Sequence, residues 1–172
     1  MNFESWARDS LGGMLRFAMV LSCDRGLAED VVQEVLVNAH RHWERISGLD
    51  NPDAYVRRMI VNEYLSWRRK WARFVPVAEL GEHDTGAAEP DHATQHADRA
   101  ELIAELAKLP PKQRAVIALR YFSGLSDAEI AETLSCRPVT VRSQASRALA
   151  TLRIEMGATN NDNSFDGAGH AN

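Results

Sequence analysis

Apolar residues recur every three or four positions along most of this chain, which is the period of an α-helix. No convincing run of alternating apolar and polar residues indicates a β-strand. The pattern therefore predicts an all-α fold. Its first helix carries one apolar stripe, formed by Phe3, Trp6, Ala7, Leu11, Met14, Leu15 and Ala18.

Start signals place two further helices in the first half of the chain. Asp24 is a favourable N-cap residue ahead of a second helix. Asn51 followed by Pro52 indicates the start of a third helix, which the pattern extends to about residue 72. Three such helices predict a compact bundle over residues 1–73. The stripe of the second helix comprises Leu27, Val31, Val35, Ala39 and Trp43.

The third helix has two chemically different faces. Five aliphatic or aromatic residues are spaced by four, four, three and four positions, and a polar, basic series repeats this spacing two residues later. Two positions correspond to about 200° around an α-helix, so the two series lie on opposite sides. The apolar series is Val56, Ile60, Tyr64, Trp67 and Trp71, and the basic series is Arg58, Asn62, Ser66, Arg69 and Arg73.

Helical periodicity is lost between residues 74 and 98, where the chain is acidic and contains Gly and Pro. This composition predicts a flexible acidic linker. In the free protein, such a linker would let the bundles on either side pack together. The tail over residues 156–172 has little to bury, and we expect it to be disordered.

A second helical bundle is predicted over residues 99–155. Its first helix ends at the sequence LPPK, and Pro111 can open the next helix, whose apolar stripe continues to Tyr121 or Phe122. Ser126 and Glu129 match the S-x-x-E capping box, which marks a helix start.

The last helix is predicted to begin near Pro138, so a short helix and a longer one flank a tight turn. This is the layout of a helix-turn-helix, whose second helix reads base edges in the major groove. The face predicted to point inward comprises Val141, Ala145, Leu149 and Leu152, and the outward face comprises Val139, Arg142, Ser143, Ser146 and Arg147.

The formal net charge of −4 hides two basic segments. Residues 57–73 carry six Lys or Arg and one Asp or Glu, and residues 108–153 carry eight and three. Each segment coincides with a predicted helix, which favours nucleic-acid contact over simple solvation of a helix face. On the third helix, arginines beside Asn62 and aromatic residues are typical of a surface for unstacked single-stranded bases, although most of those aromatic residues are expected in the core.

Signals for catalysis or metal binding are weak. Cys23 and Cys136 are isolated and fit neither a disulfide framework nor a zinc spacing. His92 and His96 have a spacing usable for a metal, with His83 nearby, but they fall in the predicted linker. We therefore expect no metal site, no cofactor and no enzymatic activity.

Three segments together resemble an extracytoplasmic-function (ECF) sigma factor of the sigma-70 superfamily, of the actinobacterial type. The segment AEDVVQEVLVNAHRHW resembles the region 2 helix that docks on RNA polymerase. The segment NPDAYVRRMIVNEYLSWRRK resembles the part that melts and reads the promoter −10 element. The segment from LPPKQRAVIALRYFSGLSDAEIAETL to TVRSQASRALATLR resembles region 4, which reads the −35 element.

This resemblance implies a promoter-specificity subunit and assigns roles to residues of this chain. It implies contact with core polymerase by Asp30, Gln33 and Glu34; contact with the −10 element by Arg58, Asn62, Arg68 and Arg69; and contact with the −35 element by Arg142, Ser143 and Arg147. It also implies core RNA polymerase and promoter DNA as partners, and an anti-sigma factor as a further possible one.

Three positions depart from the family pattern. The family usually has Gly and Ser where this chain has Ser135 and Arg137, and Gly where it has Val139. Ser is less favourable than Gly in a left-handed turn, and Arg is a poor N-cap. These differences bear on the −35 sequence that is read and leave the fold unaffected.

Two alternatives stay open at this level. A stand-alone helix-turn-helix regulator would bind duplex DNA by itself, usually as a dimer. An all-α protein-interaction module would leave both basic helices without a role. The chain has no apolar run long enough to span a bilayer and no secretory signal at its start, so a cytoplasmic location is expected, with no membrane contact.

Overall fold

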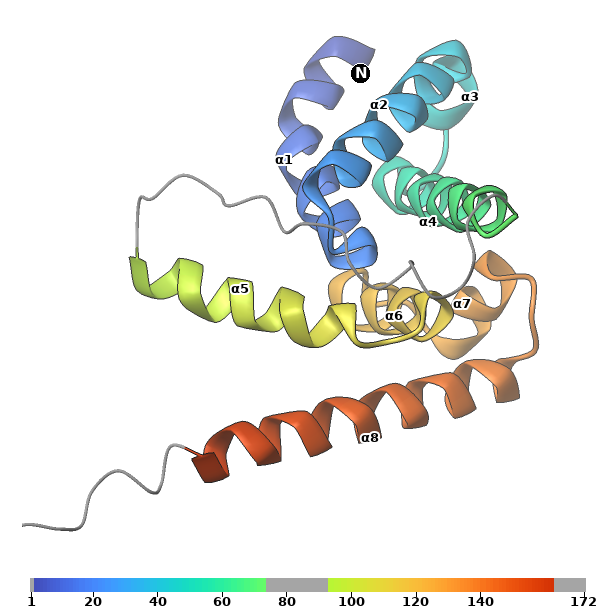
Figure 1. The fold of residues 1–172 in the computed structure, drawn as a ribbon. Helices are drawn as coiled ribbons and strands as arrows, with labels where there is room; N and C mark the ends of the chain where they lie inside the picture. Colours follow the sequence, from blue (N-terminus) through green and yellow to red (C-terminus); the bar gives the residue numbers. More distant parts are fainter. Residues whose placement is uncertain (1, 74–92, 163–172) are drawn as a thin grey trace, which may run out of the picture.

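The computed structural model describes residues 2–73 and 93–162, with side chains placed for residues 2–73 and 99–152. Within these ranges every regular element is helical, which confirms the all-α prediction. Four helices form the first bundle: α1 (Phe3–Ser22), α2 (Arg25–Arg41), α3 (Trp43–Ser47) and α4 (Pro52–Trp71). Figure 1 shows them grouped on one side of the molecule.

Helix starts in the first bundle follow the capping chemistry. The Asp24 carboxylate accepts a hydrogen bond from the Leu27 amide at 2.7 Å, and the Asn51 side chain accepts one from the Ala54 amide at 2.9 Å. Each bond satisfies one of the amides that a helix leaves unpaired at its N-terminus. Both predicted starts are therefore confirmed.

The core of the first bundle is formed by the sides of α1, α2 and α4 that face one another. Leu27, Val31, Val35 and Ala39 on α2 are buried, as are most of the predicted residues on α4. Two predicted core residues differ: Leu11 on α1 is 39% exposed, and Trp43 is half-buried and lies on α3 instead of the second helix. The helices α2 and α4 pack against the side of α1 that carries Met14, Phe17 and Leu21, and this leaves Leu11 at the edge of the stripe.

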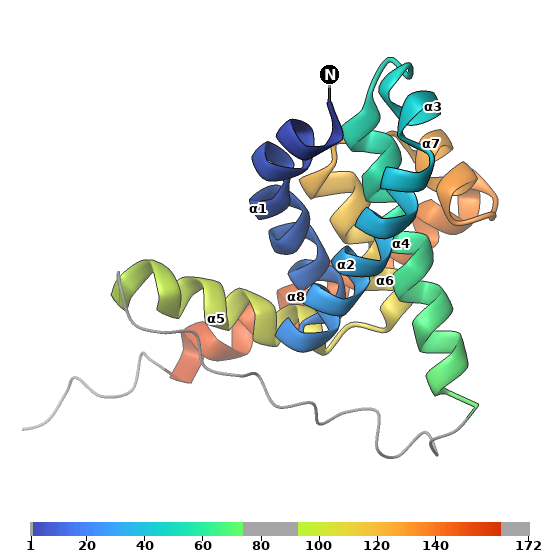
Figure 2. The ribbon, with the colours of Figure 1, turned by 90° about the horizontal axis from the view of Figure 1, so that it is seen from above.

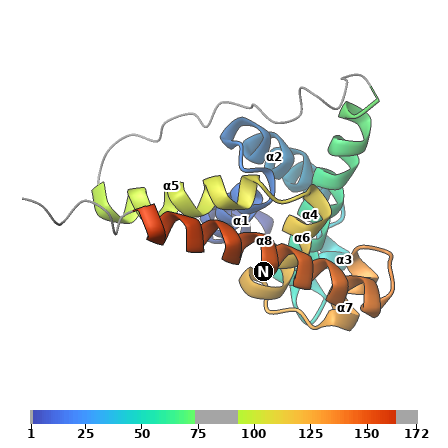
Figure 3. The same cartoon turned by 60° about the horizontal axis from the view of Figure 1, so that its bottom comes forward.

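The second bundle consists of α5 (Ala93–Ala107), α6 (Pro111–Ile117), the π-helical turn η2 (Ala118–Phe122), α7 (Asp127–Thr133) and α8 (Pro138–Asp162). The helices α5 and α8 lie side by side in all three ribbon views, as Figure 3 shows from below. Helix α8 also packs on α6 and α7, so it holds the bundle together.

The predicted apolar stripe after Pro111 is wrong at its end. Tyr121 is 58% exposed and Phe122 is 45% exposed, whereas Val116 and Leu119 are buried. The cause is the π-helical turn, which inserts an extra residue into the helix and so shifts the phase of the residues that follow.

Helical structure extends further than the sequence predicts at two places. Helix α5 begins at Ala93, inside the segment predicted to be a flexible linker, and α8 continues to Asp162, into the predicted disordered tail. Adding residues to an existing helix costs little because the nucleus is already formed. The remainder of both segments lies outside the described residues.

The turn between α7 and α8 is left-handed at Ser135, whose φ is 50°. The Cys136 amide donates to the Ala131 carbonyl at 2.9 Å and closes the C-terminal end of α7. This geometry is the left-handed turn that the sequence indicates at Ser135, where glycine is more favourable.

The two bundles pack directly on each other. Helix α1 contacts α5, α6 and η2, and α4 contacts α6, so that one apolar core runs through both bundles. Seen from above in Figure 2, α6 lies beneath α1, α2 and α4. None of the described helices is both long and apolar enough to cross a lipid bilayer.

Candidate nucleic-acid interface

One side of α2 is acidic and open to solvent. Asp30, Gln33 and Glu34 are all exposed. The other side of the helix, with Val31, Val32 and Val35, is buried in the core. Val37, one turn later, is 43% exposed, so the face also presents an apolar group. This set forms a continuous surface that another protein can contact.

The basic residues of α4 do not all have the same surroundings. Asn62 and Arg69 are exposed, whereas Arg58 and Arg68 are partly buried. The last turn carries Arg68, Arg69 and Lys70, where cations are favoured by the negative end of the helix dipole. The four predicted residues thus share one helix, with Arg58 about three turns before the basic C-terminal end.

Arg58 points at the second bundle. Its guanidinium donates to the Glu129 carbonyl at 3.4 Å and pairs with the Glu132 carboxylate at 3.6 Å, both on α7. Its neighbour Arg57 donates to the Phe122 carbonyl at 3.5 Å. Sequence reasoning placed Arg58 on an open surface and did not identify these contacts, because they join residues more than 60 positions apart.

The aromatic residues of α4 divide into two groups. Tyr64 is 1% exposed and belongs to the core, as expected. Trp67 and Trp71 are half-buried, and their rings stack at 5.2 Å with an interplanar angle of 12°. The stacked pair therefore retains exposed ring surface on the same helix as the basic residues.

The start of α4 is fixed by side-chain hydrogen bonds that the sequence pattern does not predict. The Asp53 carboxylate accepts hydrogen bonds from Trp6 Nε1 at 2.8 Å and from the Ser10 hydroxyl at 3.1 Å. Arg45 donates to the Tyr55 hydroxyl at 2.8 Å across the loop before α4. These bonds fasten the start of α4 to α1 and α3 and so fix its direction.

A capping box orients the helix-turn-helix. The Glu129 carboxylate accepts hydrogen bonds from the Ser126 amide at 2.8 Å and from the Ser126 hydroxyl at 2.7 Å. In return, the Glu129 amide donates to the Ser126 hydroxyl oxygen at 3.4 Å. These bonds hold the pKa of Glu129 below its ordinary value, and the nearby Arg58 cation acts in the same direction. The predicted capping box is confirmed.

The outward face of α8 is open. Arg142, Ser143 and Arg147 are exposed, and Val141 and Ala145 beside them are buried. The Ser143 hydroxyl donates to the Thr140 carbonyl at 2.9 Å, which leaves its oxygen able to accept a further bond. The helix therefore presents two cations and a hydroxyl on one exposed side.

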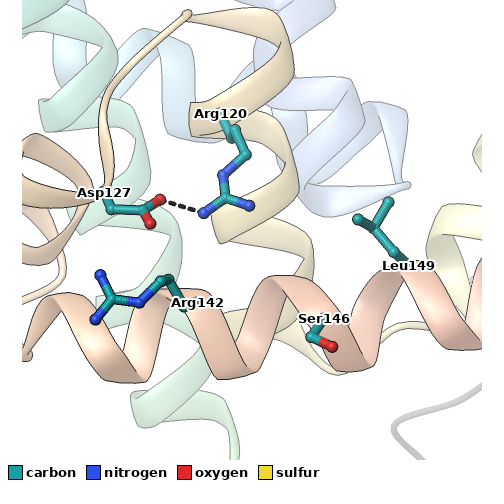
Figure 4. Close-up of a pocket in the computed structure, with 5 residues that line it drawn as sticks. All are labelled: Arg120, Asp127, Arg142, Ser146 and Leu149. Carbon is teal, nitrogen blue, oxygen red and sulfur yellow. Dashed lines mark hydrogen bonds and ion pairs between the residues drawn. The ribbon is translucent and has the colours of Figure 1, made fainter.

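Arg142 also lines a pocket between α8 and the turn before α7. Figure 4 shows Arg120 and Asp127 joined by an ion pair on one wall, with Ser146 and Leu149 on α8 opposite. Asp127 neutralises Arg120 and leaves Arg142 as the exposed cation at this site. Arg120 and Asp127 were not identified from the sequence, although they flank the Gly124 turn.

The predicted sites thus form three separate surfaces, on α2, α4 and α8. The structure brings Arg58 of the second surface onto the second bundle, next to α7, and leaves the other two surfaces open. The histidines weighed as metal ligands fall outside the residues whose side chains are described. In the part of the chain that the structure describes, no cluster of three or more His, Cys, Asp or Glu is placed to hold a metal.

Two family descriptions match most of the chain. Residues 3–74 match "Sigma-70 region 2", and residues 99–152 match "Sigma-70, region 4". The first range contains the surfaces on α2 and α4, and the second contains the helix-turn-helix.

Similar proteins that align over most of the chain are named as sigma factors. The RNA polymerase sigma-E factor of Streptomyces coelicolor is 37% identical over 163 residues, which are 94% of this chain and 90% of that protein. The ECF RNA polymerase sigma factor SigL of Mycobacterium tuberculosis is 36% identical over 156 residues, or 84% of each chain. A solved structure, the sigma factor RpoE in complex with the anti-sigma factor NepR from Bartonella quintana, superimposes with a TM-score of 0.74 at 27% identity, covering 90% of this chain and 96% of that one.

Proposed function

The chain belongs to the ECF sigma factors of the sigma-70 family, and we propose how its three surfaces divide the work of starting transcription. As an RNA polymerase sigma factor it binds core polymerase, recognises the −35 and −10 promoter elements and promotes promoter melting. The assignment of each step to particular residues is our proposal.

The α2 surface binds core polymerase. Asp30, Gln33 and Glu34 are exposed on a helix whose other side packs on α1 and α4. Exposed acidic groups around an apolar residue, here Val37, offer a partner both charge complementarity and apolar contact.

The α8 surface reads the −35 element as duplex. Arg142 and Arg147 are exposed on the second helix of a helix-turn-helix, about one and a half turns apart, with Ser143 next to Arg142. Arginine is the residue that most often contacts guanine in the major groove, and serine can contact any base or a phosphate. We assign Arg142, nearer the start of the helix, to a base edge and Arg147 to a phosphate.

The α4 surface holds the melted −10 strand. Separating a base pair from its neighbour costs about 1.4 kcal/mol of stacking per step. Arg58, Asn62, Arg68 and Arg69 provide phosphate and base contacts along one helix. The stacked Trp67 and Trp71 add a ring surface near the C-terminal end of this helix, beside Arg68. Stacking on an aromatic side chain contributes about 1–3 kcal/mol per base, enough to offset opening over a few steps.

The protein contributes binding and not chemistry of its own, so we propose that it is not an enzyme and works in the cytoplasm, with the polymerase. We also propose an anti-sigma partner, because a relative with the same fold was solved in complex with one.

The observation that carries this assignment is the presence of two basic helices on separate bundles, one of which is the reading helix of a helix-turn-helix. The test is in vitro transcription by purified core polymerase on a promoter library, with and without this chain. Transcripts that begin at defined sites only when the chain is present support the proposal. A chain that binds duplex DNA tightly by itself but directs no initiation would support the stand-alone regulator instead.

A further inference from the structure

A carboxylate lies beside the α8 surface. Asp127, the first residue of α7, lines the same pocket as Arg142, together with Arg120, Ser146 and Leu149. The pocket has a volume of about 510 Å³. Figure 4 shows Arg120 and Asp127 pointing toward each other, with Arg142 below them on α8. Among these described residues, Asp127 is the one with a negative charge, so it is the acidic neighbour of Arg142 at this pocket.

Asp127 is fixed in place from two sides. Its Oδ1 atom is ion-paired with Arg120, and its side chain is only 28% exposed. Its backbone follows Ser126, the N-cap residue that the capping box with Glu129 holds. Helix α7 in turn packs against α8. The carboxylate therefore has a fixed position relative to the helix that carries Arg142.

The ion pair leaves part of this carboxylate available. It uses Oδ1, and in the part of the chain that the structure describes Oδ2 has no hydrogen-bond partner. A carboxylate accepts hydrogen bonds at both oxygens, so Asp127 can hold a second arginine beside Arg120. The three side chains together carry one net positive charge, as Arg142 does alone. Such a contact therefore does not lower the charge that this site presents to DNA.

Arg142 is the group that needs such a contact. It is exposed, and its guanidinium has no ion pair or hydrogen bond with any described residue. A free arginine side chain occupies many rotamers, whereas a bidentate contact with guanine requires one orientation of its planar group. Holding the side chain in that orientation before it meets the base lowers the entropy lost on binding.

We propose that Asp127, held by Arg120, is a positioning residue for Arg142. Its Oδ2 accepts a hydrogen bond from the Arg142 guanidinium when α8 enters the major groove, and this bond makes Arg142 selective for one base. An exposed ion pair contributes little in water, but the same pair is stronger where DNA excludes water. This inference rests on the proposed function, because it takes Arg142 to contact a base of the −35 element.

The test measures binding of core polymerase carrying the full-length chain to promoter duplexes. The probes are a promoter recovered from the library transcription and duplexes in which each −35 base pair is replaced in turn. Arg142→Ala identifies its base pair as the position at which discrimination is lost. Discrimination is the ratio of the dissociation constants for the substituted and the original duplex. A change that only loosens the fold lowers the affinity for both duplexes and does not move this ratio.

Asp127→Asn removes the negative charge and keeps the size of the side chain. At the base pair assigned to Arg142, we expect discrimination to fall roughly threefold to fivefold, the scale of a partly exposed charge pair. Affinity for the substituted duplex should not fall, since the variant has one negative charge fewer near the phosphates. In an Arg142→Ala background the same change should leave discrimination unaltered, because Asp127 then has no guanidinium to position.

Glu101→Gln is the matched control, because it removes one negative charge from an exposed position on α5 in the same bundle. Its discrimination should equal that of the parent chain. Asp127 also lies in the first turn of α7, where an acidic residue is favoured. Asp127→Glu is therefore a second variant, which keeps the charge there and should discriminate better than Asp127→Asn.

Three results would overturn the inference. Equal discrimination by Asp127→Asn and Glu101→Gln would show that Asp127 does not position Arg142, and would leave the proposed function standing. A loss of discrimination that persists in the Arg142→Ala background would show that Asp127 acts through another group. If the parent complex discriminated at no −35 base pair, the assignment of α8 to the −35 element would fail, and the inference would fail with it.

Discussion

The two basic helices, α4 and α8, carry similar chemistry in opposite states. Arg58 of α4 is partly buried and bonded to α7 of the other bundle, whereas Arg142 and Arg147 of α8 are exposed. Both helices place an apolar side on the core and a basic side away from it. The difference between them therefore comes from what lies against each basic side and not from the pattern of residues.

This difference fits two kinds of DNA contact. A helix that reads duplex DNA needs an open, rigid face at all times, since the major groove is already accessible. A helix that holds separated strands is needed only after melting has begun. Covering the second surface and leaving the first open would favour duplex binding before strand capture.

The largest effect is expected from weakening the contact between the α2 surface and core polymerase, because both basic helices act only in the complex with polymerase. Asp30→Arg together with Gln33→Ala reverses a charge on the α2 surface and should weaken core polymerase binding at least a hundredfold, because like charges across an interface cost several kcal/mol. A pull-down or fluorescence titration with core polymerase measures this. Capture equal to that of the parent chain would contradict the assignment of α2.

A change on α8 alone should separate DNA reading from polymerase binding. Arg142→Ala removes a base-edge donor, and we expect −35-dependent transcription to fall by about tenfold, since a good base contact contributes about 1–3 kcal/mol. Polymerase affinity should not change. An equal loss of polymerase affinity would show that Arg142 acts at another interface.

A smaller effect is expected at the turn that sets the angle of α8. Ser135 adopts φ of 50°, which strains any residue other than glycine. Ser135→Gly should stabilise the chain by about 0.5–1 kcal/mol, the left-handed cost less the entropy of glycine. Thermal unfolding provides the measurement, and a lower melting temperature would contradict the strain argument.

The smallest effect concerns pH. The pKa of Glu129 in the folded chain is lowered by the bonds from Ser126, so its contribution to stability is present above the unfolded value of about 4.5 and is lost as the pH falls below it. Glu129→Gln should remove this part of the loss in the free energy of unfolding at acid pH. Near neutral pH, the free energy of unfolding should depend on pH in the same way in both chains. Urea unfolding between pH 3 and about 7 tests this, and parallel profiles for both chains would argue against the capping contribution.

Local features of the fold were predictable from the sequence. The caps at Asp24, Asn51 and Ser126 depend on side chains three residues from the amides that they bind, so a short window contains the whole interaction. The division of α8 into buried and exposed sides followed from its period for the same reason.

Features that depend on distant residues were not predictable. A buried Arg114 breaks the rule that arginine stays outside, and only the approach of Tyr64, fifty positions earlier, accounts for it. The position of Arg58 against α7 likewise depends on how the two bundles meet. Of the candidate site, the sequence thus predicted which residues are exposed on α2 and α8 but not the covering of α4.

The π-helical turn over Ala118–Phe122 has a consequence for the spacing of the helix-turn-helix. One added residue rotates everything after it by roughly a quarter turn relative to α6. Removing a single residue from this turn would rotate the rings of Tyr121 and Phe122 toward the core and change the direction of α8, the second helix of the helix-turn-helix. Chain length between α6 and α7, as much as side-chain identity, thus sets the direction from which this protein meets the double helix.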